Sequence, residues 1–385
     1  MMKFRLFIVL MLLVHFATAQ ENLDFNSQKP IVSPEIHADY SVTFRLLAPR
    51  ALEVKLVGDF GGQKEVAMQK TSDGLWTYTS SPLPSNLYSY TFKVDGLVMH
   101  DPNNVYLLRD VASVVNIFLI GNGKADDYKV NDVPHGTVLK QWYHSKGLNA
   151  ARRLTVYTPP GYESTTESYP VLYLLHGVGG DEEAWMQLGR ASQIMDNLIA
   201  NKKAKPMMVV MTNGHTSNSA APGESSKGFY KPIMMTPDVF NGDMERNFKE
   251  VIDFIEHHYR VKKNKENRAI AGLSMGGFHT LYISANYPNT FSYMGLFSPA
   301  ILPPKEKQIE LYQHLDEKLK LQQKNGYRLY WIGIGKNDFL FKPVNTYREK
   351  LDAMHFKYTY HESDGGHTWT NWRDYLVDFV PMLFK

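Results

Sequence analysis

The hydrophobic pattern divides the chain into two parts with different periodicities. Between about residues 31 and 120, short segments such as 40–47 and 88–94 alternate apolar and polar positions, with turn sequences between them. This period of two predicts half-buried strands, and several such strands at near-regular spacing are typical of a β-sandwich. From residue 136 onward, apolar runs such as 170–175 and 207–211 alternate with helical patterns. They predict a mostly parallel sheet covered by helices on both faces.

The first nineteen residues have the pattern of a secretory signal peptide. A basic start with Lys3 and Arg5 precedes a short apolar run, and Ala17-Thr18-Ala19 forms an A-x-A cleavage site. The run is shorter than the roughly 20 residues that cross a bilayer, so we expect an exported protein, periplasmic or secreted, without a stable membrane span. The predicted organisation is a signal peptide at 1–19, a β-sandwich at 20–125, a linker at 126–135 and an α/β domain at 136–385.

Charge and cysteine content exclude several classes of function. The formal net charge is +3, and removal of Lys3 and Arg5 with the signal peptide leaves +3 − 2 = +1. A near-neutral chain with scattered charges lacks the basic surface that nucleic acids require, so no nucleic-acid partner is expected. The absence of cysteine excludes disulfides and thiol chemistry. The oligomeric state is left open by the sequence.

The most specific chemical motif is Gly272-Leu-Ser274-Met-Gly276, a G-x-S-x-G sequence between a predicted strand at 267–271 and a predicted helix at 278–286. This context is that of a nucleophile elbow, in which a sharp turn exposes the serine hydroxyl. Glycines are needed on both sides because a Cβ there would clash with the neighbouring strand and helix. We therefore predict Ser274 as the nucleophile.

A serine nucleophile requires a base and an acid that orients it, and in the α/β-hydrolase fold they follow in the order Ser, Asp or Glu, His. Asp338 follows the predicted strand 327–335, and His367 follows the strand 357–361 after two glycines. We predict His367 as the general base and Asp338 as the acid. Asp364, Glu362 and Asp352 are weaker candidates for the acid.

The oxyanion hole requires two convergent backbone N–H groups. One is expected from Met275, directly after the nucleophile, and the other from the glycine-rich turn after the strand 170–175. Val178 is the first choice there and Gly179 the second, with His176 supporting the turn by hydrogen bonding.

Other chemistries do not fit the spacing of the motifs. Gly177-x-Gly179 lacks the third glycine of a dinucleotide-binding loop, and no His-Glu-x-x-His zinc motif occurs. His361, Asp364 and His367 could in principle hold a metal, but a triad explains His367 better. The sequence therefore predicts no cofactor and no metal.

With these motifs in place, residues 136–385 resemble the esterase-D-like α/β-hydrolases, particularly the feruloyl and acetyl-xylan esterases of carbohydrate esterase family 1. The resemblance rests on 173–185, 268–277, Phe297-Ser298, 335–338 and 365–373. Similarly, 44–49, 58–60, 73–76, 90–96 and Asp101-Pro102 resemble the immunoglobulin-like early-set domains related to carbohydrate-binding module 48. For this domain, a spacer or packing role is favoured over carbohydrate binding.

The resemblance implies a serine esterase that acts on an esterified plant polysaccharide or oligosaccharide, most simply a feruloyl esterase acting on xylan. An acetyl-xylan esterase, a siderophore esterase of the enterochelin type and a non-enzymatic carbohydrate-binding protein remain open alternatives. Trp185, Trp369 and Phe229 are aromatic candidates for stacking on a phenolic acid. The long loop 213–244 carries no matching motif and is expected to border the acyl pocket.

Overall fold

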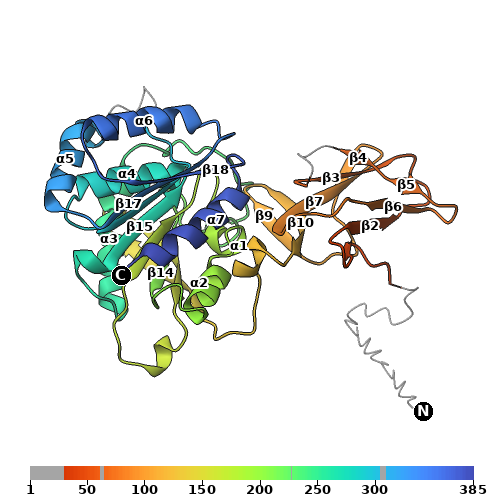
Figure 1. The fold of residues 1–385 in the computed structure, drawn as a ribbon, viewed down its shortest axis with the longest axis horizontal. Helices are drawn as coiled ribbons and strands as arrows, with labels where there is room; N and C mark the ends of the chain where they lie inside the picture. Colours follow the sequence, from red (N-terminus) through yellow and green to blue (C-terminus); the bar gives the residue numbers. More distant parts are fainter. Residues whose placement is uncertain (1–29, 61–64, 227, 304–308) are drawn as a thin grey trace, which may run out of the picture.

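A computed structural model describes residues 30–60, 65–226, 228–303 and 309–385 (Figure 1). The predicted signal peptide lies outside the described residues. Within them, no helix combines the length and the apolar character needed to cross a membrane.

Two antiparallel sheets form the N-terminal domain. One has the order β1-β2-β6-β5, and the other the order β4-β3-β7-β10-β9 with β8 paired to β7. Their inward-facing side chains share one aromatic core, in which Phe44 of β2 contacts Tyr90 of β7 and Phe118 of β10. The strands are β1 (Glu35–Ile36), β2 (Val42–Leu47), β3 (Val54–Gly58), β4 (Val66–Ala67), β5 (Gln69–Lys70), β6 (Leu75–Thr79), β7 (Asn86–Val94), β8 (Leu97–Met99), β9 (Leu107–Asp110) and β10 (Ser113–Ile120).

An eight-stranded sheet of order β11-β12-β14-β13-β15-β16-β17-β18 forms the centre of the C-terminal domain. The pairs β11–β12 and β12–β14 are antiparallel, and all later pairs are parallel. The strands are β11 (Thr137–Ser145), β12 (Ala150–Thr158), β13 (Val171–Leu175), β14 (Met208–Thr212), β15 (Arg268–Leu273), β16 (Tyr293–Phe297), β17 (Leu329–Gly335) and β18 (Thr359–Ser363).

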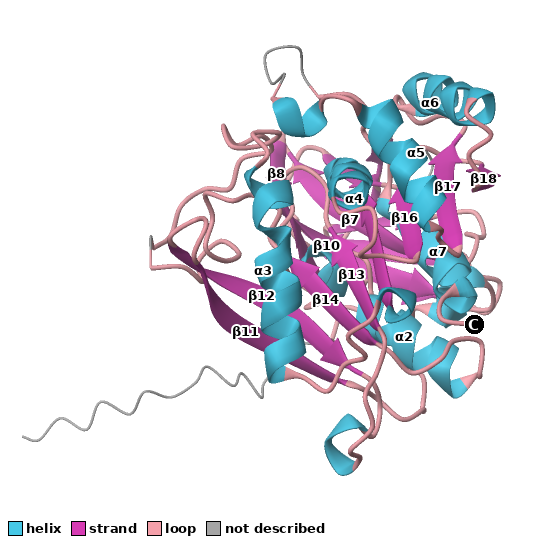
Figure 2. Cartoon of the chain, turned by 90° about the vertical axis from the view of Figure 1, so that its left-hand side faces the viewer, coloured by secondary structure: helices cyan, strands magenta, loops and turns pink. Residues whose placement is uncertain are grey.

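Helices cover both faces of this sheet, as the uninterrupted apolar strands require. Along β13, Tyr173 faces a core shared with α3 (Asp243–His258), α4 (Met275–Asn286), α5 (Leu315–Asn325) and α6 (Phe341–Ala353). Figure 2 shows α3, α4 and α5 on this side. The next residue, Leu174, faces a second core with α1 (Ala184–Gln187), α2 (Ala191–Ala200) and α7 (Trp369–Phe379).

The second core extends into the N-terminal part of the chain. Leu87 of β7, Ala125 and Tyr128 are buried among side chains of α2 and α7. Arg373 of α7 is also buried; it donates hydrogen bonds to the carbonyl oxygens of Leu188 and Leu87, and its guanidinium lies 5.1 Å from the centre of the Tyr128 ring. The two domains therefore share packed side chains where they meet.

The segment expected as a linker is held in this interface. A short 3-10 helix, η1 (Lys124–Asp127), overlaps its start, and Asn197 of α2 donates hydrogen bonds of 3.0 Å to the carbonyl oxygens of Asp127 and Lys129. Because its backbone is bonded to α2, this part of the chain is a fixed connection and not a flexible tether.

Replacement of Tyr128 by Ala should lower the free energy of unfolding by about 3–5 kcal/mol, because it leaves a cavity in the shared core and removes the ring beside Arg373. Tyr106→Ala is the matched control, since Tyr106 is largely exposed and should change stability by less than about 0.5 kcal/mol. Denaturant unfolding measures both values. Equal stabilities for the two variants would contradict a common core.

Candidate active site

Ser274 occupies a sharp turn between β15 and α4. Its backbone has φ 53° and ψ −112°, a conformation that L-residues rarely adopt. The Ser274 N–H donates to the carbonyl of Phe297 at 2.9 Å, and the Ser274 carbonyl accepts from the N–H of Ala300 at 3.1 Å. These bonds to the end of β16 and the loop after it hold the strained backbone in place, as expected of a nucleophile elbow.

The glycines around Ser274 are required by close backbone contacts. A Cβ on Gly272 would lie 2.4 Å from the carbonyl of Gly276, and a Cβ on Gly276 would lie 2.4 Å from the carbonyl oxygen of Leu175. The clash with the neighbouring strand and helix expected from the sequence is therefore present at both positions.

Strand register brings the other two predicted residues to the same sheet edge. Leu273 pairs with Phe297, Phe297 with Gly333, and Gly335 with Ser363, so β15 to β18 end together. Asp338 follows the end of β17 by three residues, and His367 follows the end of β18 by four. Loops at the carboxyl ends of parallel strands are where ligands gather in open α/β sheets.

His367 and Asp338 are in direct contact. His367 Nδ1 lies 2.9 Å from Asp338 Oδ2 and 3.1 Å from Oδ1. Burial raises the pKa of the Asp338 carboxyl, but the hydrogen bonds from His367 and from the Leu340 N–H outweigh it, so the net pKa is lowered. Asp338 is therefore ionised at neutral pH, and its contact with Nδ1 is the one expected between the predicted acid and the predicted base.

The alternative acid does not contact His367. Asp364 is 95% exposed at its side chain and pairs with Lys336 at 3.1 Å. In the part of the chain that the structure describes, Ser274 and His367 share no hydrogen bond. Such catalytic bonds are often long or poorly aligned in the unliganded state and shorten when substrate binds.

The predicted oxyanion loop is a tight turn beside the elbow. The Gly180 N–H donates to the carbonyl of Gly177 at 3.1 Å, and Gly179 has φ +77°, which fits the third position of a type II turn. A Cβ on Gly177 would lie 3.3 Å from Ser274 Cβ, so the turn is packed directly against the nucleophile.

The hydrogen bonds of this turn distinguish the two candidate donors. The Gly179 N–H is occupied, because it donates to His215 Nε2 at 3.1 Å. Among the described residues, neither the Val178 N–H nor the Met275 N–H has an acceptor. The arrangement favours Val178 and Met275 as the pair of donors, as the sequence predicts.

Two buried neutral histidines support the turn. The Gly214 N–H donates to His176 Nε2 at 2.8 Å, so Nδ1 carries the proton and donates to the Gly177 carbonyl at 2.7 Å. By the same reasoning His215 Nδ1 donates to Thr236 Oγ1 at 2.8 Å. Burial is the main cause that lowers the pKa of His176 to about 4 and that of His215 to about 3.

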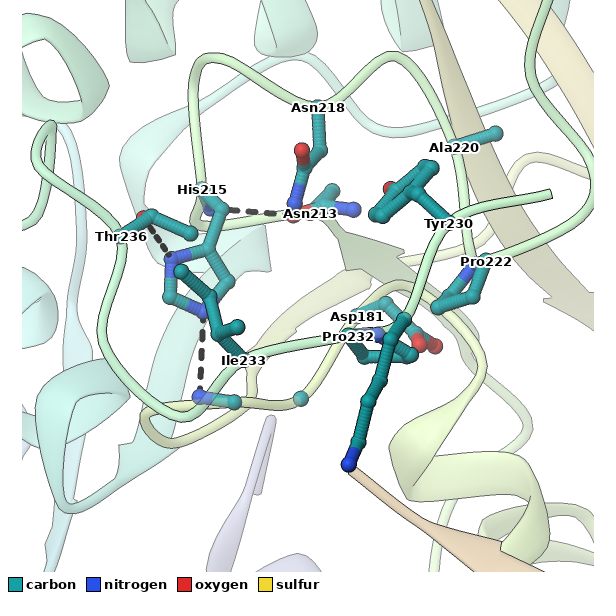
Figure 3. A pocket seen from close by; sticks show the side chains of 13 residues that line it. Asp181, Asn213, His215, Asn218, Ala220, Pro222, Tyr230, Pro232, Ile233 and Thr236 are labelled. Atoms are coloured by element: carbon teal, nitrogen blue, oxygen red, sulfur yellow. Dashed lines mark hydrogen bonds between the residues drawn. The ribbon is translucent and has the colours of Figure 1, made fainter. Parts of the chain in front are cut away.

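A cavity of about 220 Å³ adjoins this turn (Figure 3). Its walls come from the turn itself, at Gly179 to Asp181, and from the loop 213–244, which places that loop beside the predicted site. Buried Glu182 anchors the loop, because it accepts hydrogen bonds from Asn213 and from the Ala221 N–H. Glu182 itself pairs with Arg153 at 2.7 Å. The cavity is lined by Gly179, Gly180, Asp181, Asn213, His215, Asn218, Ala220, Pro222, Tyr230, Lys231, Pro232, Ile233 and Thr236.

The three aromatic candidates for substrate contact have different environments. Trp185 is buried, and its indole N–H donates to the carbonyl of Leu175 at 2.9 Å. A ring so enclosed offers no face to a substrate, so the expectation for Trp185 is corrected to a core role. Trp369 is half-buried between Trp185 and Trp372, and Phe229 is almost completely exposed on the loop 213–244.

Comparison with known families agrees with this geometry. The family described as "Putative esterase" matches residues 145–383, and carbohydrate-binding module 48 (isoamylase N-terminal domain) matches residues 32–107. The first match covers more than half of the chain.

The chain belongs to this esterase family.

Two curated relatives of the esterase are larger proteins. An endo-1,4-beta-xylanase/feruloyl esterase of Xylanibacter ruminicola is 31% identical over 364 residues, which is 91% of this chain and 46% of that protein. An esterase of Mycobacterium tuberculosis is 27% identical over 54% of this chain and 41% of its own length. The chain thus spans less than half the length of these curated relatives.

Solved structures share the fold of the esterase. A CE1 ferulic acid esterase from the anaerobic fungus Anaeromyces mucronatus has a TM-score of 0.56 at 25% identity, covering 67% of this chain and 95% of its own. The enterobactin esterase of Shigella flexneri has a TM-score of 0.61 over 89% of this chain and 92% of its own, at 17% identity, a level at which the likeness shows the fold alone.

Sequence reasoning missed two residues of this esterase site. His215 lies three residues beyond the end of β14, at the same sheet edge as the predicted triad, and that position was the signal that could have identified it. Phe339 directly follows Asp338; its ring centre lies 4.5 Å from that of His367, and the side chain is 73% exposed. The Phe339 ring is thus open to solvent beside the predicted base, whereas Trp185 is enclosed in the core.

The two neutral histidines predict a loss of stability in mild acid. Their pKa values are lowered from 6.5 in the unfolded chain, so unfolding takes up protons as the pH falls below 6.5. As the pH falls from 6.5 to 5, each histidine should reduce the free energy of unfolding with a slope that rises to about 1.4 kcal/mol per pH unit. His215→Gln retains an acceptor and a donor but cannot titrate, so its unfolding should depend less steeply on pH.

Denaturant unfolding at a series of pH values measures this slope. His314→Gln is the control, because His314 is exposed, and it should leave the slope unchanged. A His215→Gln variant with the wild-type slope would show that this imidazole does not titrate on unfolding.

Proposed function

We propose that the protein is an exported serine carboxylesterase that hydrolyses ester-linked acyl groups on plant cell-wall polysaccharide, with feruloylated xylan as the first candidate. The observation that carries the proposal is the contact of 2.9 Å between His367 Nδ1 and Asp338 Oδ2, at the sheet edge where the strained turn presents Ser274. This is the arrangement that turns a serine hydroxyl into a nucleophile.

In the proposed mechanism, Ser274 Oγ attacks the ester carbonyl carbon while His367 Nε2 takes the hydroxyl proton. The oxyanion that forms accepts hydrogen bonds from the N–H groups of Met275 and Val178, and ionised Asp338 stabilises the imidazolium. His367 then gives its proton to the leaving alcohol oxygen. Water attacks the acyl-enzyme with His367 again as base, which releases the acid and restores Ser274.

Two observations support a feruloyl group as the acyl part. The relative with 31% identity over 91% of this chain carries feruloyl esterase in its name. In addition, Phe339 offers an exposed ring next to His367, where an aromatic acyl group could stack. Acetyl-xylan hydrolysis remains the alternative within the same mechanism.

A siderophore esterase has less support. Such an enzyme is expected to gather basic side chains for catecholates, and Arg190 instead turns inward to donate to the carbonyl of Tyr128 at 3.1 Å. Lys231 lines the cavity, and Lys227 lies outside the described residues.

For the N-terminal domain, the packing role is the proposal that the contacts support. Trp76 is buried, and its indole N–H donates to the carbonyl of Ala48 at 3.0 Å, so its ring is not open for stacking on a sugar. Leu87 and Tyr128 fill the shared core.

Ser274→Ala should abolish hydrolysis of a short chromogenic ester while the melting temperature stays within a few degrees of wild type. The change removes the nucleophilic oxygen but no core volume. Release of the chromophore and a thermal melt give the two readouts. Activity within tenfold of wild type would exclude the elbow as the reaction centre.

Asp338→Asn should reduce kcat by about 10⁴-fold, because an amide favours the wrong imidazole tautomer. Asp364→Asn is the matched control and should stay within about twofold, since that carboxylate is solvent-exposed and does not contact His367. The reverse ranking in steady-state kinetics would assign the acid to Asp364.

Substrate preference can be measured with methyl ferulate, acetylated xylan and a catecholate trilactone. We expect the highest kcat/KM for methyl ferulate, and Phe339→Ala should reduce it more for this ester than for a short acetyl ester. A preference for acetylated xylan would replace the feruloyl proposal and leave the mechanism intact.

A further inference from the structure

A turn of the N-terminal domain reaches the predicted active site. The strands β9 and β10 lie where the two domains meet (Figure 1), and they are joined through Val111 and Ala112, with Asp110 paired to Ser113. A Cβ on Gly179 of the oxyanion turn would lie 2.7 Å from Val111 Cγ2 and 2.9 Å from Met234 Sδ. Val111 and Met234 therefore close over the backbone of Gly179 from two different parts of the chain.

The same turn is fixed to the catalytic domain by an ion pair. Arg109 Nη2 lies 2.5 Å from Asp181 Oδ2, and the Asp181 side chain is only 4% exposed. Arg109 Nη1 also donates to the carbonyl of Val111 at 3.2 Å. One guanidinium thus links the tip of the N-terminal hairpin to the residue that follows the turn 177–180.

The backbone of Val111 is strained. It has φ +52°, whereas Ala112 is not among the residues with positive φ, a combination that matches a II′ turn, whose first central position usually holds glycine. A β-branched residue with positive φ is a true outlier, and such strain persists where the surrounding structure imposes it, often at functional sites. Glycine at position 111 would relieve the backbone strain of the turn, whereas the contact with Gly179 requires the methyl groups of valine.

We propose that the β9–β10 turn is part of the active site, with Val111 as a positioning residue that holds the oxyanion turn through Gly179. Val111 contacts Gly179 on one side, and the Gly179 N–H donates to His215 Nε2. Together these contacts fix the peptide plane between Val178 and Gly179. The orientation of the Val178 N–H toward the oxyanion then depends on the N-terminal domain. The inference rests on the proposed role of Val178.

Val111→Gly separates stability from catalysis. Glycine relieves the backbone strain, so the melting temperature should stay equal or rise, while loss of the methyl groups frees Gly179. We expect kcat for a short chromogenic acetyl ester to fall by about tenfold, less than the 10²–10³ lost when a whole oxyanion donor is removed, with KM changed by less than about twofold. Val111→Ile, which keeps the branched contact, should retain wild-type kcat.

Val114→Ala is the matched control, because Val114 lies on the same hairpin and is 39% exposed. It should leave kcat unchanged. An equal loss in Val114→Ala would attribute the effect to a loosened hairpin and overturn the proposal, as would unchanged kcat in Val111→Gly or a rise in KM alone. If Val111→Gly is less stable than wild type, Val111→Ala serves in its place with the same expected fall in kcat.

The activities of the Ser274 and Val111 variants separate the role of the N-terminal turn from the proposed mechanism. An active wild type, an inactive Ser274→Ala and a fully active Val111→Gly would exclude only the role of the N-terminal turn. Activity in Ser274→Ala would exclude the mechanism on which that role depends.

Discussion

The site depends on how closely the turn 177–180 packs against the nucleophile elbow. There is no room for a Cβ on Gly276 beneath the carbonyl of Leu175, and a Cβ on Gly177 would meet the side chain of Leu273 at 2.5 Å. Because these backbones touch, the turn that carries the Val178 N–H packs directly against the turn that carries Ser274 and Met275. The close packing of these two backbones depends on the glycines, on the register of β13 with β15 and on the two neutral histidines.

Much of the fold could be predicted from local patterns. The strands β13, β14 and β15 are continuous apolar runs, and the helix after Ser274 was expected from its residues, although it begins at Met275 and not at Phe278. By contrast, β11 escaped prediction because its side chains are mostly polar or exposed, as suits the edge of the sheet. The grouping of Ser274, Asp338 and His367 at one sheet edge was predictable because each of them follows a recognisable strand. Strands that end at the same edge determine which loops meet.

Other features depend on contacts that no local pattern contains. From the sequence, Trp185 was expected to contact the substrate. In the structure its indole N–H donates to the Leu175 carbonyl, and the ring packs in the core. Val111 and Gly179 are 68 residues apart, in different domains, and nothing in either neighbourhood points to the other. Contacts between domains depend on docking geometry, which composition and periodicity do not encode.

The core shared by the two domains has a consequence for synthesis of the chain. Tyr128 and Leu87 emerge from the ribosome early, while Arg373, which covers them, is made 245 residues after Tyr128. At about 5–20 residues per second this interval is on the order of tens of seconds. During that time Leu87 and Tyr128 lack the cover that α7 supplies in the folded protein.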